Sequence, residues 1–164
     1  LVIVNSMSKA YGVPGLRLGY ALSGDKQFVA RLRAEVPIWS INSFAQFFLE
    51  HMGEYESRFV ESCAQVSAAT QAFYQGLQTV PWLEPYPTHG NYILCRTSPD
   101  LTGTGITERL FDEFRILVND CSGKGGLDSR FFRIASRTTA ENAALVRTLL
   151  SMAVESPASE VARK

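Results

Sequence analysis

Residues 1–19 read LVIVNSMSKAYGVPGLRLG, an apolar β-branched run followed by a polar, glycine-punctuated segment. The run Leu1–Val4 is typical of a strand that is buried on both faces, as in a parallel sheet. In open α/β sheets, ligands bind just beyond the carboxyl ends of the strands. We therefore expect a ligand-binding loop directly after this strand.

The loop of residues 5–19 concentrates groups that suit a phosphate and an aldehyde. Ser6 and Ser8 supply hydroxyls, and the Arg17 guanidinium can bind two phosphate oxygens at once. Lys9 has two interpretations: a second positive charge on the phosphate, or a nucleophile that forms a Schiff base with the aldehyde. A phosphate and an aldehyde on one small molecule describe pyridoxal phosphate.

This loop resembles the lysine-site motif of the class I/II (fold type I) pyridoxal-phosphate aminotransferases. Seven fixed positions of the pattern S-x-S-K-x-x-G-x-x-G-x-R-x-G match, which is on the order of one chance match in 10^9 windows at average residue frequencies. The resemblance implies that Lys9 is the Schiff-base lysine and carries the proton between the substrate Cα and the cofactor. It also implies that Ser6 and Arg17 hold the cofactor phosphate, with Ser8 assisting.

A second segment, residues 131–142, reads FFRIASRTTAEN. It resembles the last strand-to-helix segment of the histidinol-phosphate aminotransferase and threonine-phosphate decarboxylase branch. By this resemblance, Arg133 binds the substrate α-carboxylate through a bidentate contact. Arg137 has two interpretations, a contact to a substrate phosphate or a surface position at a helix N-terminus, and we favour the second. Asn119-Asp120 stands where the family often has Arg-Asp, so a second basic contact to the substrate is missing and the substrate class stays open.

The pattern of apolar residues and breakers predicts an α/β chain, and the resemblance implies that it forms the C-terminal part of a fold-type-I transferase. The expected parts are the end of a large sheet domain (1–52), a long linking helix (53–80), a small α/β domain (81–154) and a disordered tail (155–164). Expected helices cover 25–35, 43–52, 54–79 and 104–114, and a last helix opens with the capping box of Thr138 and Glu141. Expected strands cover 20–22, 91–96, 116–118 and 130–136. We expect Asp25 and Asn42 to cap the helices that follow them.

Composition excludes several other classes of protein. The 164 residues include 16 basic and 16 acidic side chains, and zero net charge argues against a dedicated nucleic-acid binder. No apolar run approaches the ~18–20 residues of a membrane span. The three cysteines lie far apart, with no CxxC pair and no Cys/His cluster. We therefore expect no metal site and no disulfide framework, but reduced thiols in a cytoplasmic protein.

The expected function is that of a pyridoxal-phosphate-dependent aminotransferase that acts on an amino acid. The resemblance implies a homodimer, and it places the residues that contact the cofactor ring upstream of the lysine strand. Because the sequence opens on a strand without an initiator Met, we expect this chain to begin inside a larger protein and to be inactive without its N-terminal half. Two alternatives stay open: a decarboxylase of amino-acid phosphates, and a non-catalytic fragment or dimerisation module.

Overall fold

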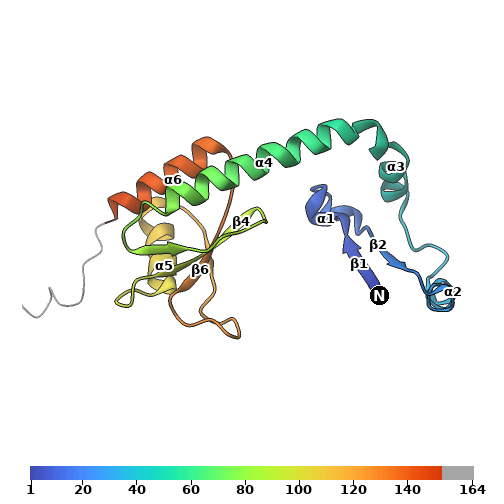
Figure 1. Ribbon diagram of the computed structural model, residues 1–164, viewed down its shortest axis with the longest axis horizontal. Coiled ribbons are helices and arrows are strands. Elements are labelled where there is room, and N and C mark those ends of the chain that lie inside the picture. The colour runs from blue at the N-terminus through green and yellow to red at the C-terminus, as the bar shows by residue number, and fades with distance from the viewer. Residues whose placement is uncertain (153–164) are drawn as a thin grey trace, which may run out of the picture. The chain divides into compact units, whose positions relative to one another are not determined.

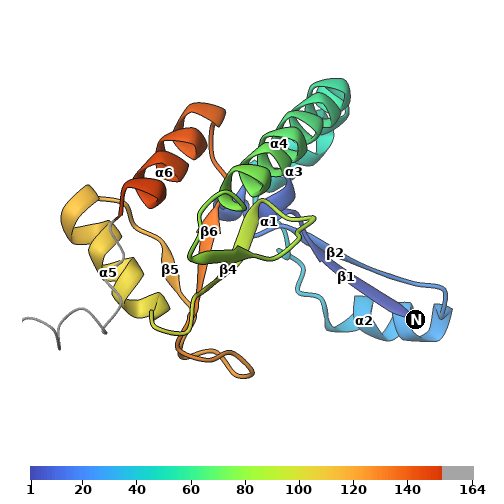
Figure 2. The ribbon, with the colours of Figure 1, turned by 60° about the vertical axis from the view of Figure 1, so that its left-hand side comes forward.

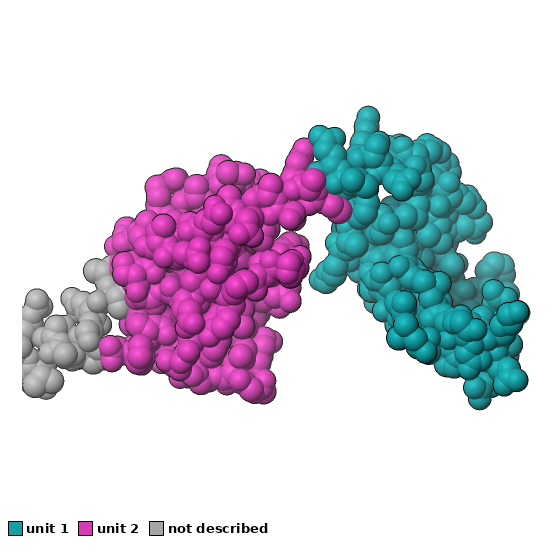
Figure 3. Space-filling view, in the orientation of Figure 1, with its two compact units in different colours: residues 1–61 teal, residues 62–164 magenta. Residues whose placement is uncertain are grey.

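A computed structural model describes residues 1–152. The chain forms two compact units, Leu1–Glu61 and Ser62–Lys164, which Figure 3 shows in different colours. The expected tail, residues 155–164, lies outside the described residues. The division falls inside a long helix, and the expected domain boundaries after residues 52 and 80 stay predictions.

The first unit is built around one pair of strands. Strand β1 (Val2–Ser6) runs antiparallel to β2 (Gly19–Ser23), with Ser6 opposite Gly19 at the end of the ladder. The prediction of a doubly buried strand of the parallel type at Leu1–Val4 is wrong for this chain, since Val4 is 80% exposed. An apolar run is buried on both faces only where helices cover both sides of a sheet, and no such layers flank β1 within residues 1–152.

Short helical turns fill the segment between these strands, where the sequence predicted a loop. Helix α1 (Met7–Ala10) follows β1 directly, and a 3-10 turn, η1 (Pro14–Leu16), precedes β2. Figure 1 shows α1 at the end of β1. The helices that follow are α2 (Lys26–Glu35) and α3 (Ser43–His51), and α3 continues into the 3-10 turn η2 (Met52–Tyr55).

Both predicted N-caps in this unit are confirmed. The Asp25 carboxylate accepts hydrogen bonds from the backbone N–H groups of Gln27 and Phe28, at 2.9 and 3.0 Å. The Asn42 side-chain oxygen accepts from the backbone N–H of Ala45 at 2.9 Å. Each cap satisfies N–H groups that the first turn of a helix leaves without partners.

The long helix α4 (Glu56–Leu77) leads into a four-stranded sheet with the strand order β3-β4-β6-β5. All pairings in this sheet are antiparallel. The strands are β3 (Leu83–Pro85), β4 (Tyr92–Thr97), β5 (Asn119–Asp120) and β6 (Phe131–Ala135). Helices α5 (Gly103–Phe114) and α6 (Thr139–Ser151) lie on the same side of the sheet (Figure 2).

One face of this sheet forms the main hydrophobic core. Along β4 and β6 every second residue is buried, which is the alternation expected of a sheet covered on one side. The core combines residues of the strands with residues of α4, α5 and α6, namely Ile93, Cys95, Phe132, Ile134, Phe73, Leu77, Ile106, Leu110, Leu145 and Leu149. Burial raises the pKa of the Cys95 thiol to about 12, so this thiol stays protonated at neutral pH.

The strands of the second unit differ from the prediction in two places. The strand predicted at 116–118 is absent, and β5 comprises only the next two residues. Helix α5 ends at Arg115 in the left-handed conformation, and the backbone N–H of Ile116 donates to the Leu110 carbonyl at 2.9 Å. This helix-ending motif packs Ile116 against the core, where it is partly buried. Its apolar side chain is therefore explained by packing at the helix end and not by a strand. Strand β3 was not predicted.

The last helix has the predicted start. The Thr138 hydroxyl accepts from the backbone N–H of Glu141 at 3.3 Å, and the Glu141 carboxylate accepts from the backbone N–H of Thr138 at 3.2 Å. These reciprocal bonds are a capping box. No helix among residues 1–152 is both long and apolar enough to span a bilayer.

Candidate active site

The turn that carries the candidate lysine sits at the carboxyl end of β1. Ser6 ends the strand and caps α1, and its hydroxyl oxygen accepts from the backbone N–H of Ser8 at 3.3 Å. Lys9 follows within α1 and is exposed. No hydrogen bond or ion pair to the Lys9 side chain occurs among the described residues. Its amine is therefore not occupied by any carboxylate of residues 1–152.

The β1–β2 ladder brings Arg17 to the same turn. The backbone N–H of Met7 donates to the Leu18 carbonyl at 3.0 Å, one residue beyond Arg17. The two strands approach so closely here that a Cβ on Gly19 would lie 2.7 Å from the Asn5 carbonyl oxygen. Four predicted residues from two separate stretches of sequence thus share one end of the strand pair: Ser6, Ser8, Lys9 and Arg17.

Arg17 has an unusual backbone for a residue with a side chain. Its φ and ψ are 54° and 42°, in the left-handed region, and its guanidinium Nη1 donates to the Pro14 carbonyl at 3.0 Å. A non-glycine residue in this region costs on the order of 1 kcal/mol, and such strain often marks functional positions. Arg115, which ends α5, has the same backbone conformation with a φ of 57°, so the conformation of Arg17 does not by itself indicate a ligand.

A small apolar cluster holds this turn in place. Met7 and Leu18 are buried beside Ala45 of α3. Tyr11 stacks on Phe59, with ring centroids 4.3 Å apart. These contacts fix the backbone on either side of Lys9 and Arg17, while the side chains of both residues stay exposed.

Asn42 connects α3 to the same loop, in addition to capping the helix. Its side-chain N–H group donates to the Leu16 carbonyl at 3.0 Å. The cap was predicted from the sequence, but this second bond was not, because it joins residues 26 positions apart. Tyr11 was also missed as a supporting residue, since nothing near it in the sequence indicates its stacking partner.

Arg133 occupies the middle of β6 in the second unit. Its neighbours Phe132 and Ile134 are buried in the core, so strand alternation directs Arg133 to the opposite face. It lies opposite Leu94 on β4 and opposite Asn119 on β5. Its guanidinium carbon lies 4.9 Å from the ring centroid of Tyr92.

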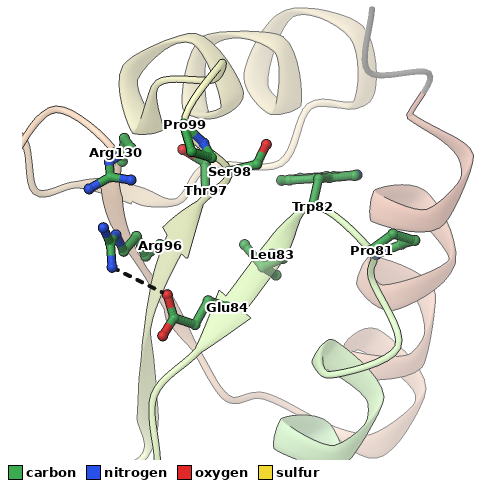
Figure 4. A pocket seen from close by; sticks show the side chains of 9 residues that line it. All are labelled: Pro81, Trp82, Leu83, Glu84, Arg96, Thr97, Ser98, Pro99 and Arg130. Carbon is green, nitrogen blue, oxygen red and sulfur yellow. Dashed lines mark ion pairs between the residues drawn. The ribbon is translucent and has the colours of Figure 1, made fainter. Parts of the chain in front are cut away.

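The other arginines near this sheet have carboxylate partners. Arg96 pairs with Glu84 at 3.5 Å, and Arg130 pairs with Asp128 at 2.6 Å. Both arginines line a pocket of about 330 Å³ beside Trp82 at the end of the sheet (Figure 4). Among the described residues, Arg133 has no ion pair. The one predicted substrate-binding residue is therefore also an arginine that no carboxylate of residues 1–152 neutralises.

Two neighbouring groups have structural roles. Arg137 is exposed and pairs with Glu141 at 2.9 Å, as expected for a surface residue at a helix start. The Asp120 carboxylate accepts hydrogen bonds from the backbone N–H and hydroxyl of Ser122 and from the hydroxyl of Thr104. These bonds hold the pKa of Asp120 below its usual value, and the bond from the Ser122 backbone N–H has the largest effect. No group of three or more candidate metal ligands occurs within residues 1–152.

Comparison with known proteins assigns this chain to a family. Residues 1–149 match the model of the family described as aminotransferase class I and II. The chain belongs to this family. The predicted resemblance is thereby confirmed, and because the enzymes of this family depend on pyridoxal phosphate, that cofactor is implied for the family as a whole.

The relatives of this class I/II family chain have several activities. It is 38% identical over 148 residues to the CMP-5'-(3-aminopropyl)phosphonate synthase of Streptomyces rubellomurinus. The aligned region covers 89% of this chain and 23% of that protein. It is 33% identical to the threonine-phosphate decarboxylase of Salmonella typhimurium, over 90% of this chain and 40% of that protein. The chain thus spans less than half the length of the curated relatives it matches.

A solved structure confirms the predicted fold class. The histidinol-phosphate aminotransferase from Clostridium acetobutylicum superposes with a TM-score of 0.83 and 26% identity. The match covers 92% of this chain and 45% of that one. The α/β architecture is therefore that of part of a fold-type-I enzyme.

Proposed function

We propose that this chain supplies the lysine and part of the phosphate site of a pyridoxal-phosphate-dependent enzyme that transaminates an amino acid. One observation carries the proposal: the β1–β2 pair brings Ser6, Ser8, Lys9 and Arg17 to a single turn. The Lys9 amine has no partner there among the described residues. A loop with only a structural role does not need that amine.

The donor set of this turn fits the cofactor. A phosphate requires hydrogen-bond donors and positive charge, which the two serine hydroxyls and the Arg17 guanidinium supply. An aldehyde requires an accessible primary amine, and Lys9 is exposed. When bound, pyridoxal phosphate supplies the aldehyde carbon and an electron-withdrawing ring.

The residues of this chain then have separate roles in the reaction. Arg133 binds the substrate carboxylate and so orients the Cα–H bond. The Lys9 Nζ would accept the proton from the substrate Cα and hand it on to the cofactor side of the reacting system, acting as base and then as acid. Ser6, Ser8 and Arg17 hold the phosphate fixed while the proton moves.

Decarboxylation of an amino-acid phosphate is the second candidate. The 33% identity to a threonine-phosphate decarboxylase favours it, as does the similarity, at 27% identity, to an L-serine phosphate decarboxylase of Campylobacter jejuni. The same lysine and arginine serve either reaction, because the two reactions differ in which bond at Cα is broken. Incubation of the complete protein with O-phospho-L-threonine separates them: decarboxylation releases CO2, whereas transamination yields a keto acid and requires an amino acceptor.

We also propose that the complete protein is a cytoplasmic homodimer. Exposed apolar side chains in the segment before α3 and in its first turn support self-association, since Trp39 is 91% and Phe44 78% exposed. Sedimentation of the complete protein and of a Trp39→Ser/Phe44→Ser variant tests this proposal. A wild-type protein that sediments as a monomer contradicts it.

Covalent trapping tests the central proposal. The protein is mixed with pyridoxal phosphate, reduced with borohydride and digested, and the labelled peptide is identified by mass spectrometry. We expect the label on Lys9 and none in Lys9→Ala. Lys26, which is also exposed and lies in the same unit, provides the control variant Lys26→Ala, which should label normally. A Lys9→Ala protein that is labelled to the wild-type extent overturns the proposal. If this chain alone is not labelled but the complete protein is, the chain is a non-catalytic fragment that needs its other half.

A further inference from the structure

The guanidinium of Arg133 is held by an aromatic ring and not by a carboxylate. Its central carbon lies 4.9 Å from the centroid of the Tyr92 ring, well within the ~6 Å range of a cation–π contact. Tyr92 begins β4 and lies opposite Ala135, two residues along β6 from Arg133. A diagonal neighbour of this kind is within reach of a long side chain on the same face of a sheet.

This type of contact brings no anion to the guanidinium. An aromatic ring attracts the cation through its π face and has no carboxylate oxygen to bind the N–H groups that an incoming carboxylate would use. Arg96 and Arg130, in contrast, direct their N–H groups at Glu84 and Asp128. Arg133 is thus oriented by a neighbour that does not compete with an incoming carboxylate.

The ring of Tyr92, and not its hydroxyl, makes this contact. No hydrogen bond to the hydroxyl occurs among the described residues. Gly90 leaves the space that the ring occupies, because a Cβ there would lie 3.3 Å from Cε1 of Tyr92. The surroundings therefore accommodate the aromatic ring without using the phenol oxygen.

From these contacts we infer that Tyr92 is a positioning residue for Arg133, which fixes its guanidinium for the α-carboxylate of the substrate. The inference rests on the proposed function, in which Arg133 binds that carboxylate. It deepens that function by naming the residue that orients the arginine. It also predicts that an aromatic ring at position 92 suffices, with or without a hydroxyl.

The test compares two ligands that differ by one carboxylate. O-phospho-L-serine carries the α-carboxylate, and O-phosphoethanolamine is the same molecule without it. Stopped-flow absorbance titration of the complete protein loaded with pyridoxal phosphate gives an apparent Kd before turnover. We expect Tyr92→Leu to weaken the binding of O-phospho-L-serine about three- to tenfold and to leave that of O-phosphoethanolamine unchanged. Tyr92→Phe should bind both like the wild type.

Three outcomes overturn the inference. Equal weakening of both ligands in Tyr92→Leu indicates a merely structural role. Failure of Tyr92→Phe to restore binding assigns the effect to the hydroxyl. A wild-type protein that binds O-phospho-L-serine no more tightly than O-phosphoethanolamine has no carboxylate contact for Tyr92 to position. Borohydride labelling of Lys9 in the same samples shows separately whether the proposed function itself survives.

Discussion

Replacement of Arg17 by glycine separates the phosphate-binding role of this residue from its place in the fold. Glycine adopts the left-handed conformation freely, so Arg17→Gly removes a backbone strain of roughly 1 kcal/mol. Glycine also makes the unfolded chain more flexible, which costs about 0.4–1 kcal/mol. The exposed hydrogen bond to the Pro14 carbonyl is lost as well, at about 0.5–1.5 kcal/mol. Together these effects should lower the free energy of unfolding by about 0–1.5 kcal/mol.

Cofactor affinity should behave differently. Hydrogen bonds between a guanidinium and a phosphate each contribute about 1.5–3 kcal/mol, so Arg17→Gly should weaken the binding of pyridoxal phosphate by more than about tenfold. The assay is a titration of the complete protein with pyridoxal phosphate, followed by absorbance, beside urea unfolding of the same variant.

The chain contains a matched control for this substitution. Arg115 is also exposed, also has a left-handed φ of 57°, and ends α5. Arg115→Gly should have a similarly small effect on stability and none on cofactor affinity. The reasoning is refuted if Arg17→Gly binds pyridoxal phosphate as tightly as the wild type, or if both variants lose affinity equally.

Further predictions concern the substrate, the packing of the second unit and its response to acid. Arg133→Lys should raise the KM for the amino acid more than about tenfold in the complete enzyme, because lysine cannot form the bidentate contact; an unchanged KM would remove Arg133 from the site. Gly103→Ala should lower the free energy of unfolding by more than about 2 kcal/mol, since its Cβ would lie 2.6 Å from the Phe131 carbonyl oxygen. Gly123→Ala, at a position with open space, is the control, and equal stabilities of the two variants in urea would contradict the packing argument. Asp120→Asn should flatten the loss of stability in acid. The pKa of Asp120 is lowered in the folded protein. Its carboxylate therefore stabilises the protein fully above about pH 3.9, and this stabilisation is lost as the pH falls through the pKa of the folded state. Urea unfolding between about pH 2 and 5 measures this, and identical slopes in both proteins would show that the bonds to Asp120 do not stabilise the fold.

Local signals in the sequence were sufficient where a structural feature depends on neighbouring residues. Asp25, Asn42 and Thr138 cap the predicted helices, because a cap requires only a short polar side chain two or three residues before the N–H groups that it binds. The resemblance to the lysine-site motif could be recognised for the same reason, since its seven fixed positions fall within residues 6–19. Arg133 was predicted to bind the substrate because it belongs to a short strand-to-helix motif, and this role stays a prediction.

Features that depend on distant partners were not predictable in this way. The burial of Leu1–Val4 depends on layers that would have to pack against β1, so its apolar composition alone gave the wrong environment. Ile116 is a β-branched residue typical of strands, but it packs against the core next to the end of a helix. The bond from Asn42 to the Leu16 carbonyl and the stacking of Tyr11 on Phe59 join residues far apart in the chain.

By itself, the sequence determined the chemistry of this protein: which amine, hydroxyls and guanidinium groups are present, and that their spacing is typical of a pyridoxal-phosphate site. Only the tertiary structure decided how these groups are held. The strand ladder brings Arg17 beside the lysine turn in a strained conformation, and β6 directs Arg133 away from the core, with its guanidinium carbon 4.9 Å from the centroid of the Tyr92 ring. The physical reason is that residue type specifies what a side chain can bind, whereas its direction and its neighbours follow from backbone pairing between segments that are remote in the chain.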